Sequence, residues 1–239
     1  MDTPESEIIQ RLLFQPLQSP LYKQLNSIGN DFYKVVQYAN EHVIDDSFTQ
    51  AMVNLVSAQY FIGIAPIVQV LFALNTAKEL GQEYVFSVLL RSLTELVGRV
   101  HKVVRLYETF QKNGDADNLL SKSKRLLRHY VKVDQQESNV VPLNGFNVMT
   151  LVKSLQDKIP DIEEKYDDLS TYFHGEIITH SLYRKMTHFQ QLAGQEPTAI
   201  SAHDEFVHKL IDILITDLMF IREVVKPLIN RYTEKHTEI

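Results

Sequence analysis

The residues that could carry chemistry begin at Arg91, in the stretch RSLTE. On a helix, Arg91 and Glu95 share one face with Gly98 and Lys102, because positions three and four apart lie above one another. Two interpretations remain open. The pair is a solvated ion pair that contributes little to stability, or it borders a polar groove where Gly98 lets another element approach. In such a groove the arginine would hold a phosphate.

A second group, Tyr166, Ser170 and His174, has the spacing of one helix face and lies beside an apolar stripe. That position is typical of the interface between two helices. The group is either a hydrogen-bond network that fixes the packing, or a pair of hydroxyls that hold His174 as a general acid or base facing an arginine. For an active site, we predict Arg91, Glu95 and His174 as the catalytic residues, with Tyr166 and Ser170 in support.

A third group is the basic half of the helix predicted at residues 119–133. This segment contains no acidic residue, although the whole chain has a net charge of −6. The basic half is either a solvated helix face or a surface that contacts phosphate backbones without reading sequence. The nucleic-acid-binding residues predicted on it are Lys122, Lys124, Arg125, Arg128 and Lys132.

We expect no cofactor and no metal ion. The chain contains no cysteine, no Gly-rich phosphate loop and no GxSxG motif. Glu205 and His208 have the ExxH spacing of di-iron bundles. Those bundles need a second such motif and two further carboxylates, and the sequence offers no second motif on a core face.

The element expected to position these groups is an apolar segment at residues 47–77, which contains no charged residue and no histidine. Its amides, with Gly63 and Pro66, argue against a membrane span, because an amide in lipid needs a partner. We predict instead a central hairpin of two buried helices, 47–62 and 66–80, kinked or broken before Pro66.

The rest of the chain has the apolar spacing of amphipathic helices and no convincing strand alternation. We predict an all-α, multi-helix bundle with a long C-terminal helix that is kinked at Pro227. The length fits one helical domain over residues 1–239, with residues 1–45 either inside it or forming a small N-terminal appendage. The other predicted helices span residues 4–14, 20–42, 83–112, 115–136, 147–158, 161–174, with a further helical piece to residue 187, and 202–235.

The same motifs carry a resemblance. The run NTAKELGQEYVFSVLLRSLTEL, followed later by YDDLSTYFHG, resembles a group of bacterial helical proteins that share an R-S-x-x-E helix and an L-S-x-x-x-H helix. Those proteins are similar to the HEPN superfamily, helical bundles of toxin–antitoxin and phage-defence systems, many of which are metal-independent ribonucleases. The resemblance covers residues 60–180 and implies a bundle that is HEPN-like in part.

The signature of that superfamily is an arginine followed, after four to six residues, by a histidine. In this chain Arg125 and His129 are separated by three residues, as are Arg184 and His188. A ribonuclease site would therefore combine residues from different helices, which again indicates Arg91, Glu95 and His174.

The expected function is that of a cytoplasmic protein of a defence or toxin-type system that binds RNA or DNA, with metal-independent ribonuclease activity as its catalytic form. The alternative is a non-catalytic helical adaptor that binds a partner protein or a second copy of itself. A membrane-active effector that uses residues 47–77 is a third hypothesis. A cytoplasmic location is expected because the N-terminus lacks the basic and apolar regions of a secretory signal.

Overall fold

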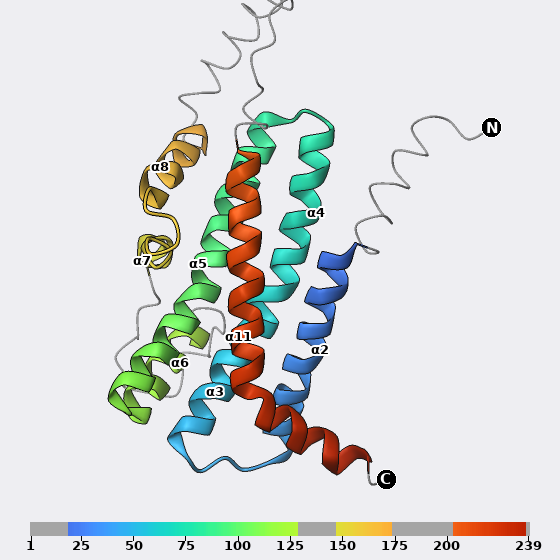
Figure 1. Ribbon diagram of the computed structural model, residues 1–239, viewed down its shortest axis with the longest axis vertical. Coiled ribbons are helices and arrows are strands. Elements are labelled where there is room, and N and C mark those ends of the chain that lie inside the picture. The colour runs from blue at the N-terminus through green and yellow to red at the C-terminus, as the bar shows by residue number, and fades with distance from the viewer. Residues whose placement is uncertain (1–18, 129–146, 174–202, 238–239) are drawn as a thin grey trace, which may run out of the picture.

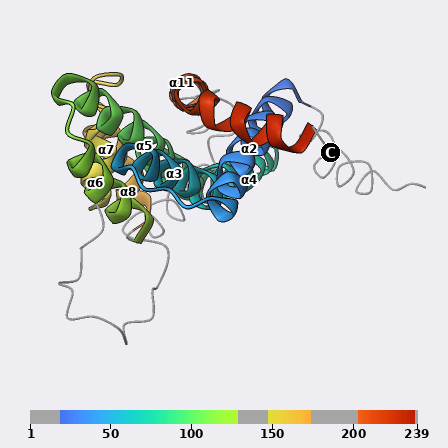
Figure 2. The same ribbon diagram turned by 90° about the horizontal axis from the view of Figure 1, so that it is seen from below.

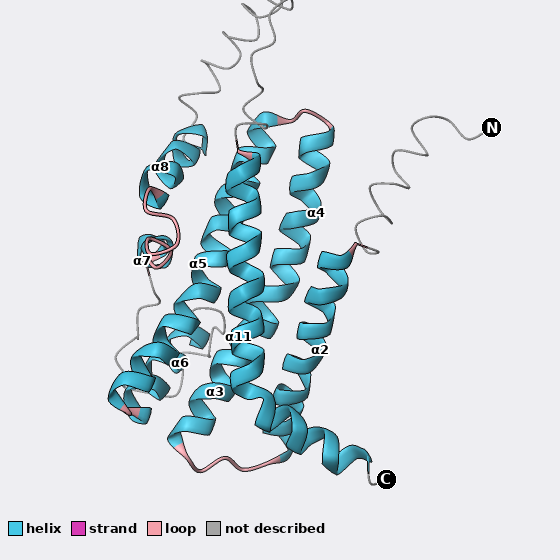
Figure 3. Ribbon diagram, in the orientation of Figure 1, coloured by secondary structure: helices cyan, strands magenta, loops and turns pink. Residues whose placement is uncertain are grey.

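The computed structural model describes residues 19–128, 147–173 and 203–237, and the regular secondary structure within these ranges is all helical (Figures 1 and 3). This confirms the predicted all-α class. In chain order, the elements are α2 (Pro20–Glu41), α3 (Ser47–Ala58), the π-helix η1 (Gln59–Ile64), α4 (Ala65–Glu79), α5 (Glu83–Asn113), α6 (Ala116–Arg128), α7 (Val148–Lys153), α8 (Ile162–Phe173) and α11 (Asp204–Thr237).

Helix α2 begins where the sequence provides a start signal. The Ser19 side chain accepts a hydrogen bond from the Tyr22 N–H, and Pro20 takes the first helical position, where its missing N–H does no harm. The inner face of α2 belongs to the same apolar core as the other helices, through Leu25, Ile28, Phe32 and Val35.

The predicted hairpin within residues 47–80 is wrong. Segments α3, η1 and α4 form one continuous helix, Ser47–Glu79, which Figure 1 shows running from α3 up through α4. The Asp46 side chain caps its start by accepting a hydrogen bond from the Thr49 N–H. Pro66 does not end the helix. It lies in the first turn of α4, directly after η1, and the wider turns of a π-helix accommodate the missing backbone donor.

This long helix is also less buried than predicted. Only 47% of its most apolar 18-residue stretch is buried inside the protein, and Phe61 is 63% exposed. Among the described residues it is the one helix that is long and apolar enough to cross a membrane, by length and composition alone. The core helix of a globular protein can have the same length and apolar composition as a membrane span.

Helix α5, and not the uncharged segment, is the helix on which most of the others assemble. It packs against α4, α6, α7, α8 and α11. Figure 2 shows α6, α7 and α8 on one side of α3 and α5, with α2 and α11 toward the other side. Helix α5 ends at Asn113, and Gly114 follows it in the left-handed conformation, with a φ of 69°.

Helix α6 is amphipathic, as predicted, and packs on α3. Its apolar face buries Leu119 and Leu126, and the Asn54 side chain of α3 donates a hydrogen bond to the buried Ser123 hydroxyl. Helix α7 ends at Lys153, earlier than predicted, and hydrogen-bonded turns continue the chain to α8.

The predicted long C-terminal helix is confirmed as α11, which packs against α2 and α5. The helix bends, and its last part crosses the end of α2 (Figure 1), where Lys235 pairs with Glu41. Pro227 lies inside the helix, where it removes one backbone hydrogen bond. The Arg222 guanidinium binds the Asp31 carboxylate of α2, with Nη2 2.6 Å from Oδ2. This ion pair joins the first and last described helices.

Candidate functional site

Three of the predicted site residues, Arg91, Glu95 and Tyr166, lie together where α8 packs on α5. The Arg91 Nε–H donates a hydrogen bond to the Tyr166 hydroxyl oxygen (3.0 Å), and the Tyr166 hydroxyl donates one to Glu95 Oε1 (2.5 Å). Arg91 Nε is also 3.4 Å from Glu95 Oε1, and the guanidinium lies 5.1 Å from the centre of the Tyr166 ring. We call these three residues the Tyr166 cluster.

Local sequence explains why these side chains meet. Helix α5 places Arg91 and Glu95 one turn apart on the face toward α8, and α8 buries Ile162, Tyr166 and Leu169 on its own inner face at spacings of four and three. The Arg91 and Glu95 side chains are 22% and 25% exposed. The pair is therefore not the solvated ion pair of the first interpretation, because a tyrosine of another helix completes it.

The environment of Tyr166 fixes its protonation. Burial, followed by its hydrogen bond to Glu95, raises the pKa of Tyr166 to about 12, and the hydrogen bond from Arg91 offsets part of that rise. Tyr166 therefore keeps its proton near neutral pH and can donate a hydrogen bond but cannot act as a general base. Burial lowers the pKa of nearby Arg99, and the charge of Glu95 partly opposes that effect.

Of the other two members of the predicted histidine group, the structure describes only Ser170. The Ser170 hydroxyl donates a hydrogen bond to the Tyr166 carbonyl oxygen one turn earlier (2.8 Å), which is a local helix contact. His174 directly follows α8 in the sequence and lies outside the described residues. The structure thus brings Arg91, Glu95 and Tyr166 together.

Gly98 lets another element approach, as the second interpretation predicted. A Cβ atom at this position would lie 2.5 Å from the carbonyl oxygen of Leu151 in α7, so only glycine fits without a shift of backbone. The Ser154 hydroxyl lies 2.9 Å from the Gly98 carbonyl oxygen and 2.5 Å from that of Leu151. Helix α7 therefore covers this face of α5.

The basic residues of α6 lie on the side of that helix away from its apolar face. The Lys124 side chain is exposed, and those of Lys122 and Arg125 are half-buried. Arg128 ends α6, but its side chain is outside the described part of the structure, as is all of Lys132. Lys122, Lys124 and Arg125, together with Lys102 of α5, are called the basic surface below.

Lys102 belongs to this group because of its electrostatic neighbours. Burial lowers the pKa of Lys102, and the positive charges of Lys122 and Arg105 lower it further. Two helices that pack against each other, α5 and α6, thus bring like charges within range of one another. A concentration of like charge is unfavourable for the protein alone and favourable for binding an anion.

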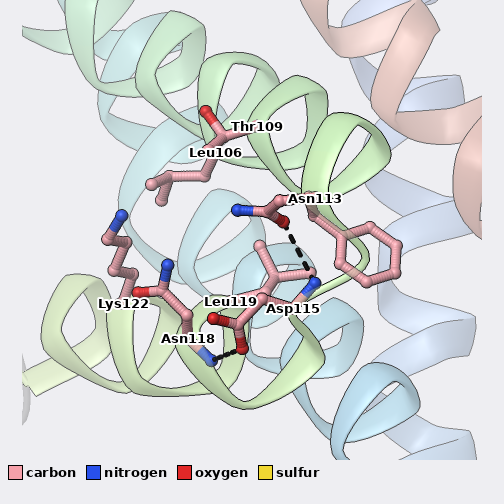
Figure 4. A pocket seen from close by; sticks show the side chains of 8 residues that line it. Leu106, Thr109, Asn113, Asp115, Asn118, Leu119 and Lys122 are labelled. Atoms are coloured by element: carbon pink, nitrogen blue, oxygen red, sulfur yellow. Dashed lines mark hydrogen bonds between the residues drawn. The ribbon is translucent and has the colours of Figure 1, made fainter.

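Next to the basic surface, a small pocket lies between the end of α5 and the start of α6 (Figure 4). Lys122 forms one wall, and the remaining lining residues are Leu106, Thr109, Phe110, Asn113, Asp115, Asn118 and Leu119. The space in it that a water molecule can occupy is about 10 Å³. Pockets for small organic ligands usually measure about 300–1,000 Å³, so this one is too small for a typical organic substrate.

A polar group that the sequence did not predict lies deeper, between α5, α11 and the connection from α7 to α8. His101 Nδ1 is 2.8 Å from Asp217 Oδ2, and His101 Nε2 is 3.2 Å from Asp157 Oδ1. The His101 and Asp217 side chains are buried, at 2% and 6% exposed, whereas Asp157 is 39% exposed. We call these three residues the His101 bridge.

The sequence contained two weak signals of this bridge. His101 falls among the apolar residues of α5, next to Val100 and Val103, and Asp217 interrupts the most apolar part of α11. Buried ionisable residues are rare without a partner. Each signal alone predicts only that some partner exists, because the packing of α5 against α11 decides which one it is.

Within the described ranges, no group of three or more His, Asp or Glu side chains is arranged to hold a metal ion. The two candidate functional features of the described structure are the part-buried Tyr166 cluster and the basic surface. Comparison of the chain with protein-family models, curated proteins and solved structures finds no match.

Proposed function

We propose that this chain is a cytoplasmic helical protein that binds RNA or DNA through the phosphate backbone, with the basic surface as the contact. The observation that supports this most strongly is that Lys102 of α5 lies within electrostatic range of Lys122 of α6, a helix that also carries Lys124 and Arg125, in a chain whose net charge is −6. Phosphate contacts need cations that reach solvent and no deep cavity; Lys124 is exposed, and Lys102, Lys122 and Arg125 are half-buried. The small size of the pocket beside Lys122 agrees with a surface contact of this kind.

The proposal is tested by fluorescence anisotropy with labelled single-stranded RNA and double-stranded DNA at low salt. The test variant carries Lys122→Ala, Lys124→Ala and Arg125→Ala. The control carries Lys23→Ala, Lys158→Ala and Lys226→Ala, which removes the same charge from exposed positions elsewhere.

We expect the test variant to bind at least about tenfold more weakly than the control, since charged contacts dominate non-specific affinity. Equal weakening in both variants would mean that net charge alone is responsible. An absence of binding by the native chain would reject the proposal.

The catalytic form of the proposal is metal-independent RNA cleavage. Arg91 would neutralise a phosphate, and His174, which follows α8 directly in the sequence, would remove the proton of the attacking ribose 2′-hydroxyl. The part-exposed Arg91 of the Tyr166 cluster supports this form. The test is His174→Ala in an RNA cleavage assay, with His208→Ala as the control. Cleavage by His174→Ala at the native rate would remove His174 from the mechanism.

A second candidate function, an adaptor that binds protein, is favoured by one specific observation. Tyr33 and Phe61 are 45% and 63% exposed, and Tyr60 lies between them, with ring centres 5.5 Å from Tyr33 and 5.1 Å from Phe61. Exposed aromatic groups of this kind are common in protein interfaces. The first test is self-association, because Phe61→Ser should shift a concentration-dependent dimer to monomer in sedimentation equilibrium. A native chain that is monomeric at all concentrations would exclude a homodimer.

A further inference from the structure

The His101 bridge joins three separate parts of the chain through one imidazole ring. Helix α5 supplies His101, α11 supplies Asp217, and the connection between α7 and α8 supplies Asp157. Both ring nitrogens lie within hydrogen-bond distance of a carboxylate oxygen, at 2.8 Å and 3.2 Å. Among the described residues, no other buried side chain contacts two carboxylates from two other parts of the chain.

The chemistry of imidazole makes this arrangement depend on protonation. A protonated ring donates from both nitrogens, whereas a neutral ring has one N–H and one lone pair. Carboxylates are acceptors only, so both contacts are hydrogen bonds only while His101 is charged. The charged groups that face the ring are Asp217 from α11 and Asp157 from the α7–α8 connection. Arg105 of α5 lies on the outer side of Asp157, with Nη1 3.7 Å from Oδ2.

The difference in burial decides which contact is lost first. Asp217 is 6% exposed, so loss of its hydrogen bond to His101 would leave an unpaired charge in the core, which is unfavourable. Asp157 is 39% exposed and can be hydrated instead. A neutral His101 therefore keeps its proton on Nδ1 toward Asp217, and its Nε2 lone pair then faces the oxygen of Asp157, which repels it.

We propose that protonated His101 holds the α7–α8 connection against α5 and α11, and that loss of this proton releases Asp157 and loosens α7 and α8. This device goes beyond nucleic-acid binding and does not depend on it. Because α8 carries Tyr166 and α7 packs at Gly98, the protonation of His101 would control how firmly one wall of the Tyr166 cluster is held.

The direction of the pH effect follows from the contacts. Burial lowers the pKa of His101, but the hydrogen bond and charge of Asp217, then those of Asp157, outweigh burial and raise it above its usual value. A raised pKa in the folded chain means that the bridge stabilises the fold fully below the unfolded value of about 6.5. That contribution is lost as the pH rises through the higher, folded-state pKa of His101.

The experiment measures amide hydrogen-exchange protection of residues 148–169 at about pH 6 and about pH 9, with α2 as the internal reference. Protection factors are compared, because intrinsic exchange itself accelerates with pH. The native chain is compared with Asp157→Asn, which removes the outer carboxylate at an exposed position, and with His101→Gln. Asp157→Asn alone is sufficient where His101→Gln does not fold.

For the native chain, we expect the protection factors in α7 and α8 to fall at least about tenfold at the higher pH, because the loss of one charged hydrogen bond has about that effect. The protection factors in α2 should stay constant. Asp157→Asn should have low protection at both pH values. The inference is overturned by native protection that does not change with pH, by an equal change in α2, or by Asp157→Asn retaining the native pH dependence.

Discussion

At the scale of single residues, two buried polar side chains show opposite situations. The Tyr166 hydroxyl has a donor and an acceptor from α5. The amide of Gln59 in η1 is buried, and neither its oxygen nor its nitrogen has a hydrogen-bond partner among the residues that the structure describes. Net hydrogen-bond energies are modest, but an unpaired buried group is clearly unfavourable. These two residues therefore give two predictions of opposite sign.

Tyr166→Phe should destabilise the fold by about 1–3 kcal/mol, because the half-buried Arg91 and Glu95 both lose a partner. The measurement is urea unfolding, with Tyr84→Phe as the control at a tyrosine that is 44% exposed. Equal unfolding midpoints for the two variants would show that the Tyr166 cluster contributes nothing to stability.

Gln59→Met should instead stabilise the fold by about 1 kcal/mol, because methionine has a similar length and no polar group to leave unpaired. The Gln59 side chain packs closely against Gly63, since a Cβ atom on Gly63 would lie 2.8 Å from Gln59 Oε1. An unbranched replacement such as methionine fits this narrow space better than a branched one. The control is Gln69→Met at an exposed position of α4. A lower melting temperature for Gln59→Met than for the control would contradict this assignment.

At the scale of elements, sequence periodicity was sufficient to predict where most helices lie, because amphipathic spacing and caps such as Ser19, Asp46 and Gly114 are local properties. The hairpin prediction was wrong because a proline alone does not reveal whether a π-helical turn will accommodate it. The central position of α5 also escaped prediction, since packing partners are set by the whole fold and not by one period.

The approach of α7 to α5 gives a prediction with a matched control. Gly98→Ala should destabilise the fold by about 1–3 kcal/mol, because its Cβ would lie 2.5 Å from a backbone oxygen of Leu151. Gly29→Ala in α2 meets only the Ile64 side chain, at 3.7 Å, and should gain up to about 1 kcal/mol of helix stability. Thermal unfolding of the two variants measures both effects, and equal shifts of the same sign would show that the close approach is not as described.

At the scale of the whole molecule, the candidate site could be predicted only in part. The RSLTE motif and the tyrosine of the YDDLSTYFHG run supply side chains that meet across two helices, and the catalytic role assigned to them stays a prediction. The His101 bridge could not be predicted, since its three members are far apart in sequence and join only through packing. The basic surface was predicted as a property of α6 alone, and the structure adds Lys102 from α5.

The central claim, that cations of α5 and α6 contact a phosphate backbone, is tested most directly by the salt dependence of RNA binding. Four cations that each neutralise one phosphate of a single strand predict a slope of log K against log salt of about −3, and removal of three of them should reduce its magnitude by about 2. The variant Lys122→Ala, Lys124→Ala, Arg125→Ala should show that reduction, and the variant Lys23→Ala, Lys158→Ala, Lys226→Ala should keep the native slope. A native slope near zero, or the same slope in all three proteins, would contradict the claim.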